Sequence, residues 1–214
     1  ILSVEDPKCK DIFKSYNFDI VVHLAAQVSV AKSIVNPIND AQSNIVGLIN
    51  MLHLAGQHHV KKFIFASSAA VYGNNAHFPL VENLETTPIS PYGISKRVGE
   101  HYCLNWTEQY DLDTICFRFS NVYGPRQTSE GEGGVVSIFT SRILDSETLQ
   151  IHGDGNQTRD FIYVTDVAFA IYRASQSILS GIYNLSTNTE ASVNDIVHFL
   201  GKSHGTIQTT YTSA

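Results

Sequence analysis

The stretch that decides the fold is Val60-Lys-Lys-Phe-Ile-Phe-Ala-Ser-Ser68, a short apolar run that ends in small hydroxyl residues. A nearly continuous apolar run of this length is typical of a parallel strand that helices cover on both faces. A similar run, Phe18–Leu24 (FDIVVHL), precedes it, and Asn36-Pro37 between the two supplies a helix N-cap followed by a proline. We expect this helix to reach about His58, which completes one right-handed βαβ unit.

A second unit of the same kind follows along the chain. Ser90-Pro91 is another cap-plus-proline signal, and the helix that it begins is predicted to reach about Tyr110. The apolar run Thr114–Phe119 (TICFRF) then predicts the next strand. Repeated strand-helix-strand order predicts an α/β fold with a Rossmann-like, doubly wound parallel sheet.

The pattern changes after Gly124-Pro125, where glycine-rich turns separate shorter elements. The predicted elements are a helix near 136–144, strands at 161–164 and 181–185, and helices that begin at Thr165 and at the Ser192 capping box. We therefore predict a first domain over residues 1–125 and a smaller C-terminal α/β lobe over 126–214. Residues of about 159–176 are predicted to return to the first domain.

Composition and charge exclude several classes of protein. The 20 acidic residues outnumber the 14 basic ones and no basic run exists, so we expect no nucleic-acid partner. No apolar stretch reaches about 18 residues, so we expect no membrane span. Cys9, Cys103 and Cys116 lack metal or disulfide spacing, so we expect reduced thiols and a cytoplasmic protein. The adjacent His58 and His59 diverge on a helix, so we expect no metal site.

The candidate chemistry lies in Tyr92-Gly-Ile-Ser-Lys96. Residues four apart on a helix share one face, and this helix follows a strand that ends at Ser67-Ser68, so the three side chains Ser68, Tyr92 and Lys96 are expected to converge. A phenol with an ordinary pKa of about 10 needs nearby positive charge to act as a base at neutral pH, and Lys96 can supply it. A neighbouring hydroxyl can hydrogen-bond the reacting oxygen, so the group fits hydride chemistry between an alcohol and a ketone.

Several further motifs occur in a consistent order between about Asp19 and His198. They are His23-Leu-Ala-Ala26, Asn44, Phe63–Gly73, Ser90–Lys96, Arg118–Arg126 (RFSNVYGPR) and Leu149–Asp160 (LQIHGDGNQTRD). Together they resemble the extended short-chain dehydrogenase/reductase family, and within it the nucleotide-sugar epimerases of the UDP-glucose 4-epimerase type.

The resemblance implies a role for each matched residue. Tyr92 corresponds to the catalytic base, Lys96 to the ribose ligand that tunes it, and Ser68 to the catalytic hydroxyl. NAD is implied as the cofactor, with contacts from Ala25, Ala26, Asn44, Ser67, Lys96 and Phe119. A nucleotide sugar, with a UDP-hexose favoured, is implied as the substrate, with contacts from Ser68, Asn121, Val135, Gln150, His152 and Arg159. Asn121 and Arg159 would bind its diphosphate, and a homodimer is the implied assembly.

The implied reaction is 4-epimerisation through transient oxidation at C4 and return of the hydride to the other face. Family dehydratases typically carry an acidic residue just after the catalytic hydroxyl, whereas this chain has Ala69-Ala70, which disfavours elimination. Another sugar-nucleotide reductase or dehydratase of the extended family remains an alternative. A non-catalytic NAD-binding or regulatory protein is the alternative from a different class.

The sequence departs from the family pattern in one respect. Family members open with a strand and a glycine-rich turn that binds the pyrophosphate. The glycines of this chain never take G-x-G-x-x-G or G-x-x-G-x-x-G spacing, and the residues before Phe18 cannot hold two further βα units. We therefore expect that the first βα units are absent, that the chain is incomplete at both ends, and that as given it is inactive.

Overall fold

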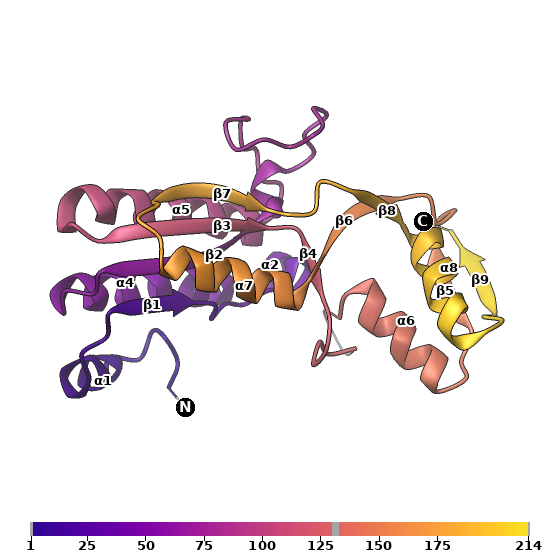
Figure 1. Cartoon of the computed structure of the whole chain (residues 1–214), viewed down its shortest axis with the longest axis horizontal. Helices are drawn as coiled ribbons and strands as arrows, with labels where there is room; N and C mark the ends of the chain where they lie inside the picture. Colours follow the sequence, from indigo (N-terminus) through magenta and orange to yellow (C-terminus); the bar gives the residue numbers. More distant parts are fainter. Residues whose placement is uncertain (1, 130–132, 214) are drawn as a thin grey trace. The chain divides into compact units, whose positions relative to one another are not determined.

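The computed structural model describes residues 2–129 and 133–213, and these fall into two compact units (Figure 1). Unit 1 comprises the described residues up to Phe119 together with Phe169–Leu185. Unit 2 comprises Ser120–Ala168 and the described residues from Ser186 onward.

The boundaries of the units differ from those predicted. The chain leaves unit 1 after Phe119 and not after residue 125, and the segment that returns is Phe169–Leu185, where about 159–176 was predicted. The reason is strand pairing: β7 (Gly181–Leu185) pairs with unit 1, whereas β6 (Thr158–Tyr163) pairs within unit 2.

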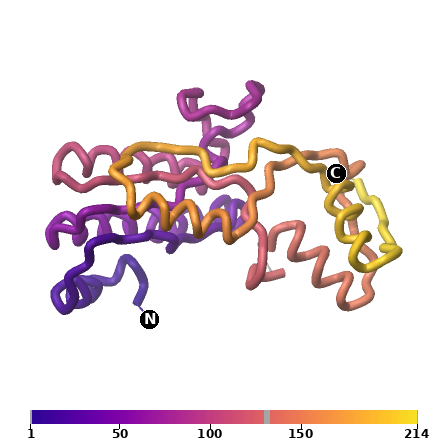
Figure 2. Tube along the Cα trace, in the orientation of Figure 1, coloured from indigo at the N-terminus to yellow at the C-terminus, as the bar shows by residue number. Residues whose placement is uncertain are grey.

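Unit 1 contains a four-stranded parallel sheet, which confirms the predicted Rossmann-like α/β architecture. Its strands in spatial order are β1 (Ile20–His23), β2 (Lys62–Ser68), β3 (Asp113–Phe119) and β7. Most residues of β2 and β3 are buried, as a sheet covered on both faces requires. Figure 2 shows that β3 and β7 lie side by side although they are far apart in the sequence.

Helices connect and cover these strands. They are α1 (Cys9–Ser15), α2 (Val30–Val35), α3 (Pro37–Ala41), α4 (Gly47–Gln57), α5 (Pro91–Tyr110) and α7 (Val164–Ser175), with a short 3-10 turn at Ala69–Tyr72. The helix predicted over 36–58 begins at the expected cap, since the Asn36 side chain accepts a hydrogen bond from Asn39 N. It differs from the prediction in its middle, where Gln42–Val46 form a π-helical turn between α3 and α4.

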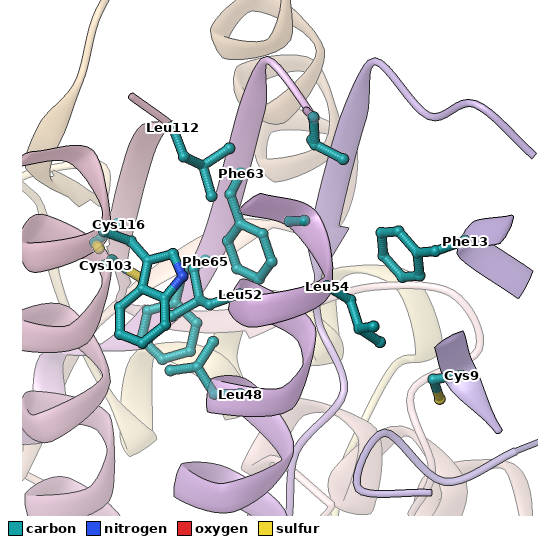
Figure 3. Close-up of a cluster of buried hydrophobic side chains, with 13 residues drawn as sticks. Cys9, Phe13, Leu48, Leu52, Leu54, Phe63, Phe65, Cys103, Leu112 and Cys116 are labelled. Atoms are coloured by element: carbon teal, nitrogen blue, oxygen red, sulfur yellow. The ribbon is translucent and has the colours of Figure 1, made fainter. Parts of the chain in front are cut away.

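Side chains that alternate along β2 build two cores, one on each face of the sheet. Phe63 and Phe65 pack against Leu48 and Leu52 of α4 on one face, as Figure 3 shows. Ile64 points to the other face, into a cluster that includes Ala174 of α7. Burial of one such large apolar side chain stabilises the fold by about 1.5–3 kcal/mol. The packing therefore holds α4 and α5 on one side and the end of α7 on the other.

Unit 2 is a smaller α/β unit with a core of its own. Its elements are β4 (Asn121–Tyr123), α6 (Val135–Leu144), β5 (Leu149–His152), β6, β8 (Glu190–Ser192), α8 (Val193–His204) and β9 (Thr209–Thr212). One sheet has the order β4-β6-β8 and the other pairs β5 with β9. The predicted capping box is present, because Ser192 and Asp195 each bond the other's backbone at the start of α8.

Candidate active site

Ser68 stands at the carboxyl end of β2, where the strand gives way to a tight turn. Its Oγ accepts a hydrogen bond from Ala70 N at 3.1 Å and so caps the 3-10 turn. Phe119, the last residue of β3, is its register partner on the neighbouring strand. Two predicted site residues are thus brought together at the sheet edge where ligands bind in folds of this kind.

Tyr92 lies in the first turn of α5, and its position is fixed by the start of that helix. Ser90 caps the helix by accepting a hydrogen bond from Gly93 N at 3.1 Å, and Tyr92 N donates to Ser33 Oγ at 3.1 Å. A Cβ on Gly93 would lie 2.8 Å from the carbonyl oxygen of Ala70, so only glycine lets the helix approach the turn so closely. The approach brings the Tyr92 side chain into hydrogen-bond contact with Ser68.

Lys96 follows one turn later on the same helix face, and it is only 3% exposed. Its Nζ donates to the carbonyl oxygen of Ala66 at 2.8 Å and lies 5.8 Å from the centre of the Tyr92 ring. Burial lowers the pKa of Lys96 to about 8, although the negative charge of Asp40 acts in the opposite direction. At neutral pH Lys96 is therefore still mainly an ammonium group.

The phenol of Tyr92 has a pKa above its ordinary value of 10.0. Burial is the main cause; the hydrogen bond with Ser68 acts to lower the pKa, and the charge of Asp40 raises it further. The depressed pKa that we expected from the proximity of Lys96 is therefore not found in this arrangement. The phenol is neutral at pH 7 here, and ionising it requires additional positive charge beside it.

The N–H donors of the Lys96 ammonium group fit the ribose that carries the nicotinamide of NAD. An ammonium group has three N–H donors, and the described contacts of Nζ include one acceptor, Ala66 O. The other donors can serve ribose hydroxyls. Ala25 and Ala26 follow Leu24 after the end of β1, and Ala25 is exposed whereas Ala26 is half-buried. These residues would hold the nicotinamide end of the cofactor.

Asn44 and Ser67 were expected to contact the cofactor, but their side chains make internal bonds here. The Asn44 amide is buried in the π-helical turn and bonds both the N–H and the carbonyl of Gln27, each at 2.8 Å. It also donates to Asp40 at 3.0 Å and to Ser95 at 3.3 Å. Ser67 Oγ donates to Glu100 Oε1 at 2.6 Å. Cofactor contact by these two side chains stays a prediction, since it requires these bonds to be exchanged.

A buried ion pair that we did not predict from the sequence supports the site. Glu100 lies four residues after Lys96 on α5 and is fully buried. Its carboxylate accepts two hydrogen bonds from the Arg118 guanidinium, at 2.8 and 2.9 Å, and one from Arg97 at 2.9 Å. Burial would raise the pKa of Glu100, but the bonds from Arg118 and Ser67 outweigh it, so the pKa lies below its ordinary value. Through Arg118 and Ser67, the Glu100 carboxylate ties α5 to β3 and β2.

The predicted substrate residues of unit 2 come from four separate elements. Asn121 begins β4 and Arg159 lies on β6 of the same sheet, both exposed. Gln150 and His152 share the exposed face of β5, and Val135 is the first residue of α6. The described contacts in unit 2 join none of these five side chains to another; His152, for example, bonds Thr212 at 2.9 Å.

Unit 2 contains one organising carboxylate that the sequence did not single out. Asp160 accepts hydrogen bonds from Ser120 Oγ at 3.0 Å, from both the N–H and the hydroxyl of Thr187, and from Thr189 N. It thereby joins the two places where the chain enters unit 2, Ser120 next to Asn121 and the segment after Leu185. Its neighbour Arg159 is held at the start of the same strand.

The described residues contain neither a metal-binding cluster nor a membrane-spanning helix. Across 2–129 and 133–213, no group of three or more His, Cys, Asp or Glu side chains is placed to hold a metal ion. No helix in these ranges is both long enough and apolar enough to cross a membrane.

Comparison with known proteins gives a consistent result. Residues 3–186 match the NAD dependent epimerase/dehydratase family. A putative UDP-glucose 4-epimerase of Methanocaldococcus jannaschii is 43% identical over 195 residues, which are 89% of this chain and 64% of that protein. The human dTDP-D-glucose 4,6-dehydratase is 36% identical over 86% of this chain and 52% of its own length. This chain thus spans less than two thirds of the length of these relatives.

Solved structures extend the match to three dimensions. The UDP-glucose 4-epimerase of Thermotoga maritima, determined with UDP-glucose, superposes with a TM-score of 0.94 and 39% sequence identity. The superposition covers 99% of this chain and 70% of that one.

Proposed function

We propose, from the premise that this chain belongs to the NAD dependent epimerase/dehydratase family, that its protein is an NAD-dependent nucleotide-sugar 4-epimerase. The favoured substrates are UDP-glucose and UDP-galactose. The observation that carries the proposal is the convergence of Ser68, Tyr92 and Lys96 at the carboxyl end of β2. Binding of a dinucleotide alone does not need this combination of a phenol, a hydroxyl and a buried ammonium group.

The mechanism assigns one task to each of these side chains. Tyr92, once ionised, accepts the proton of the sugar hydroxyl at C4 while the hydride leaves the same carbon. Ser68 donates a hydrogen bond to that oxygen and so holds it beside the phenol. Lys96 binds the ribose and contributes the positive charge that favours the phenolate. NAD bound there would accept the hydride and return it to the opposite face of the sugar.

Ala69 and Ala70 favour epimerisation over dehydration. They follow Ser68 in the 3-10 turn, and Ala70 N is held by Ser68 Oγ, so the turn lies directly beside the proposed reaction centre. Elimination of water needs a further proton donor within hydrogen-bond reach of the sugar, and methyl side chains cannot act as one. The likeness to a 4,6-dehydratase therefore reflects the shared family machinery and not the outcome of the reaction.

Unit 2 is proposed to bind the nucleotide sugar. Arg159 carries an exposed guanidinium suited to a diphosphate, and Asn121 lies in the same sheet. Gln150, His152 and Val135 are proposed to contact the nucleotide base.

We also propose that the protein is a cytoplasmic homodimer. The cysteines at 9, 103 and 116 are free, which suits a reducing compartment. Light scattering on the purified protein would measure its assembly.

The experiment that tests the function follows the fate of the sugar. The protein that carries this chain is incubated with NAD and UDP-galactose, and the products are separated by chromatography and identified by NMR. We expect interconversion with UDP-glucose and no net consumption of nicotinamide cofactor. A 4-keto-6-deoxy product would show a dehydratase, and an obligatory supply of NADH would show a reductase.

A second arm separates the enzyme from a non-catalytic NAD-binding protein. A regulatory protein would bind NAD by calorimetry but would leave both UDP-sugars unchanged. If the wild type and Tyr92→Phe both bind NAD and both leave the UDP-sugars unchanged, Tyr92 has no catalytic role.

A further inference from the structure

Asp40 is a buried carboxylate to which the proposed mechanism gives no role. It lies on α3 and is only 1% exposed. Its Oδ1 accepts hydrogen bonds from Gln27 Nε2 at 2.9 Å and from Asn44 Nδ2 at 3.0 Å, both neutral donors. The ion pairs among the described residues are Lys61–Asp19, Arg97–Glu100 and Arg118–Glu100, and none includes Asp40.

A buried carboxylate without a cation in contact is expensive to keep ionised. The free-energy cost of ionising such a carboxylate is offset by a positive charge in its vicinity, even without direct contact. Asp40 is joined through Asn44 to Ser95 Oγ, and Ser95 precedes Lys96 on α5. The buried ammonium group of Lys96 interacts electrostatically with Asp40, and so does the phenol of Tyr92.

We propose that Asp40 is a positioning residue whose buried charge keeps Lys96 in its ammonium form beside Tyr92. The inference rests on the proposed function of Lys96, and it assigns Asp40 no contact with substrate or cofactor. Asp40 also opposes ionisation of Tyr92, so its charge acts on both partners in the same direction. Removing it therefore lowers the pKa of the ammonium and of the phenol together.

Other charges near Lys96 do not replace Asp40. His23 on β1 is kept uncharged, since burial and the charge of Lys96 lower its pKa to about 4. Cys103 of α5 is fully buried and acts on the pKa of Lys96 in the same direction as Asp40, with a smaller effect. On α5 itself, Glu100 and Arg97 are bonded to each other. On the elements packed against α5, the other titratable groups are the bonded Arg118, Tyr72 and Lys62, the buried thiol Cys116, and the exposed Lys32, His53 and Asp113.

The substitution Asp40→Asn isolates the charge. Because both hydrogen bonds end on Oδ1, an asparagine can keep them through its own carbonyl oxygen. The matched control is Asp19→Asn, which removes an exposed carboxylate paired with Lys61. If Asp40→Asn does not fold, Asp40→Ser provides a smaller uncharged acceptor for the same test.

The first readout needs neither cofactor nor substrate. The Lys96 ammonium is titrated by NMR in protein labelled with ¹⁵N-lysine, its signal being the one missing from Lys96→Met. We expect its pKa to fall by about one unit in Asp40→Asn, the lower end of what a nearby opposite charge contributes, and to stay unchanged in Asp19→Asn. An unchanged Lys96 titration in folded Asp40→Asn would overturn the proposal, whatever reaction the protein catalyses.

The second readout is the pH profile of turnover. Loss of the Asp40 charge should move both limbs of the profile to lower pH, because phenol and ammonium shift together. A merely structural role would lower the plateau and leave the limbs in place, and that result would also overturn the proposal.

Discussion

The buried pair of Glu100 and Arg118 allows a quantitative prediction for Glu100→Gln. The variant is nearly isosteric, but it leaves the guanidinium of Arg118, only 3% exposed, without an anion. Breaking one side of a buried ion pair costs about 3–5 kcal/mol. For a protein of this size each kcal/mol lowers the midpoint of thermal unfolding by about 2–4 °C, so we expect a loss of about 6–20 °C.

The assay can use the single tryptophan, Trp106, which stacks on Tyr110 at the end of α5 and reports on unit 1. Removal of the exposed Lys61–Asp19 pair by Asp19→Asn is the control and should leave the midpoint unchanged. The folded pKa of Glu100 lies below its ordinary value of 4.5, so its contribution is present above that pH and is lost as the pH falls through the folded pKa. Wild type and variant should therefore converge in acid. A midpoint in Glu100→Gln as high as in the control would refute the reasoning.

Three further predictions concern other residues of unit 1. Tyr92→Phe should reduce turnover at least a hundredfold and leave NAD binding nearly unchanged, which kinetics and calorimetry on one sample would check. His23 is buried in its neutral form with a pKa of about 4, against 6.5 for an ordinary histidine, so acid protonates the unfolded state first. The free energy of unfolding of the wild type should therefore fall by about 2 kcal/mol between pH 7 and pH 5. Urea unfolding should show that this free energy depends less on pH in His23→Phe. Gly99→Ala should destabilise by about 1–3 kcal/mol, because its Cβ would lie 2.7 Å from Phe65. Gly56→Ala, with no neighbour closer than 3.6 Å, should instead be neutral or stabilising, and equal effects of the two would contradict the packing argument.

The parts of the fold that could be predicted are those whose signal lies within the segment itself. Strands such as β2 are buried on both faces, and their sequences are therefore apolar runs. The start of α5 is marked in the sequence by the capping Ser90 followed by Pro91. By contrast β9, Thr-Thr-Tyr-Thr at 209–212, is short and polar and depends on its partner β5. The π-helical turn likewise depends on the distant Gln27, which the Asn44 amide bonds.

The candidate site shows the same division. Tyr92 and Lys96 could be found because a spacing of four places them on one helix face. Glu100 continues that spacing, so the same rule could have placed it in the interior. Asp40 carried no such signal, because an isolated aspartate in a sequence usually lies in solvent and its burial is settled by the elements around it.

The alternation of the chain between its two units has a consequence for synthesis on the ribosome. The face of the sheet formed by Ile64, Ile115 and Phe117 is covered by residues 171–185, which emerge only after β4, α6, β5 and β6 of unit 2. Until then a nascent chain exposes both this apolar face and the edge of β3 that β7 later occupies. Exposed apolar surface and unpaired strand edges are what chaperones bind and what drives aggregation. Unit 1 therefore cannot mature as an independent first step of translation, and slow elongation through residues 120–168 would lengthen its most vulnerable interval.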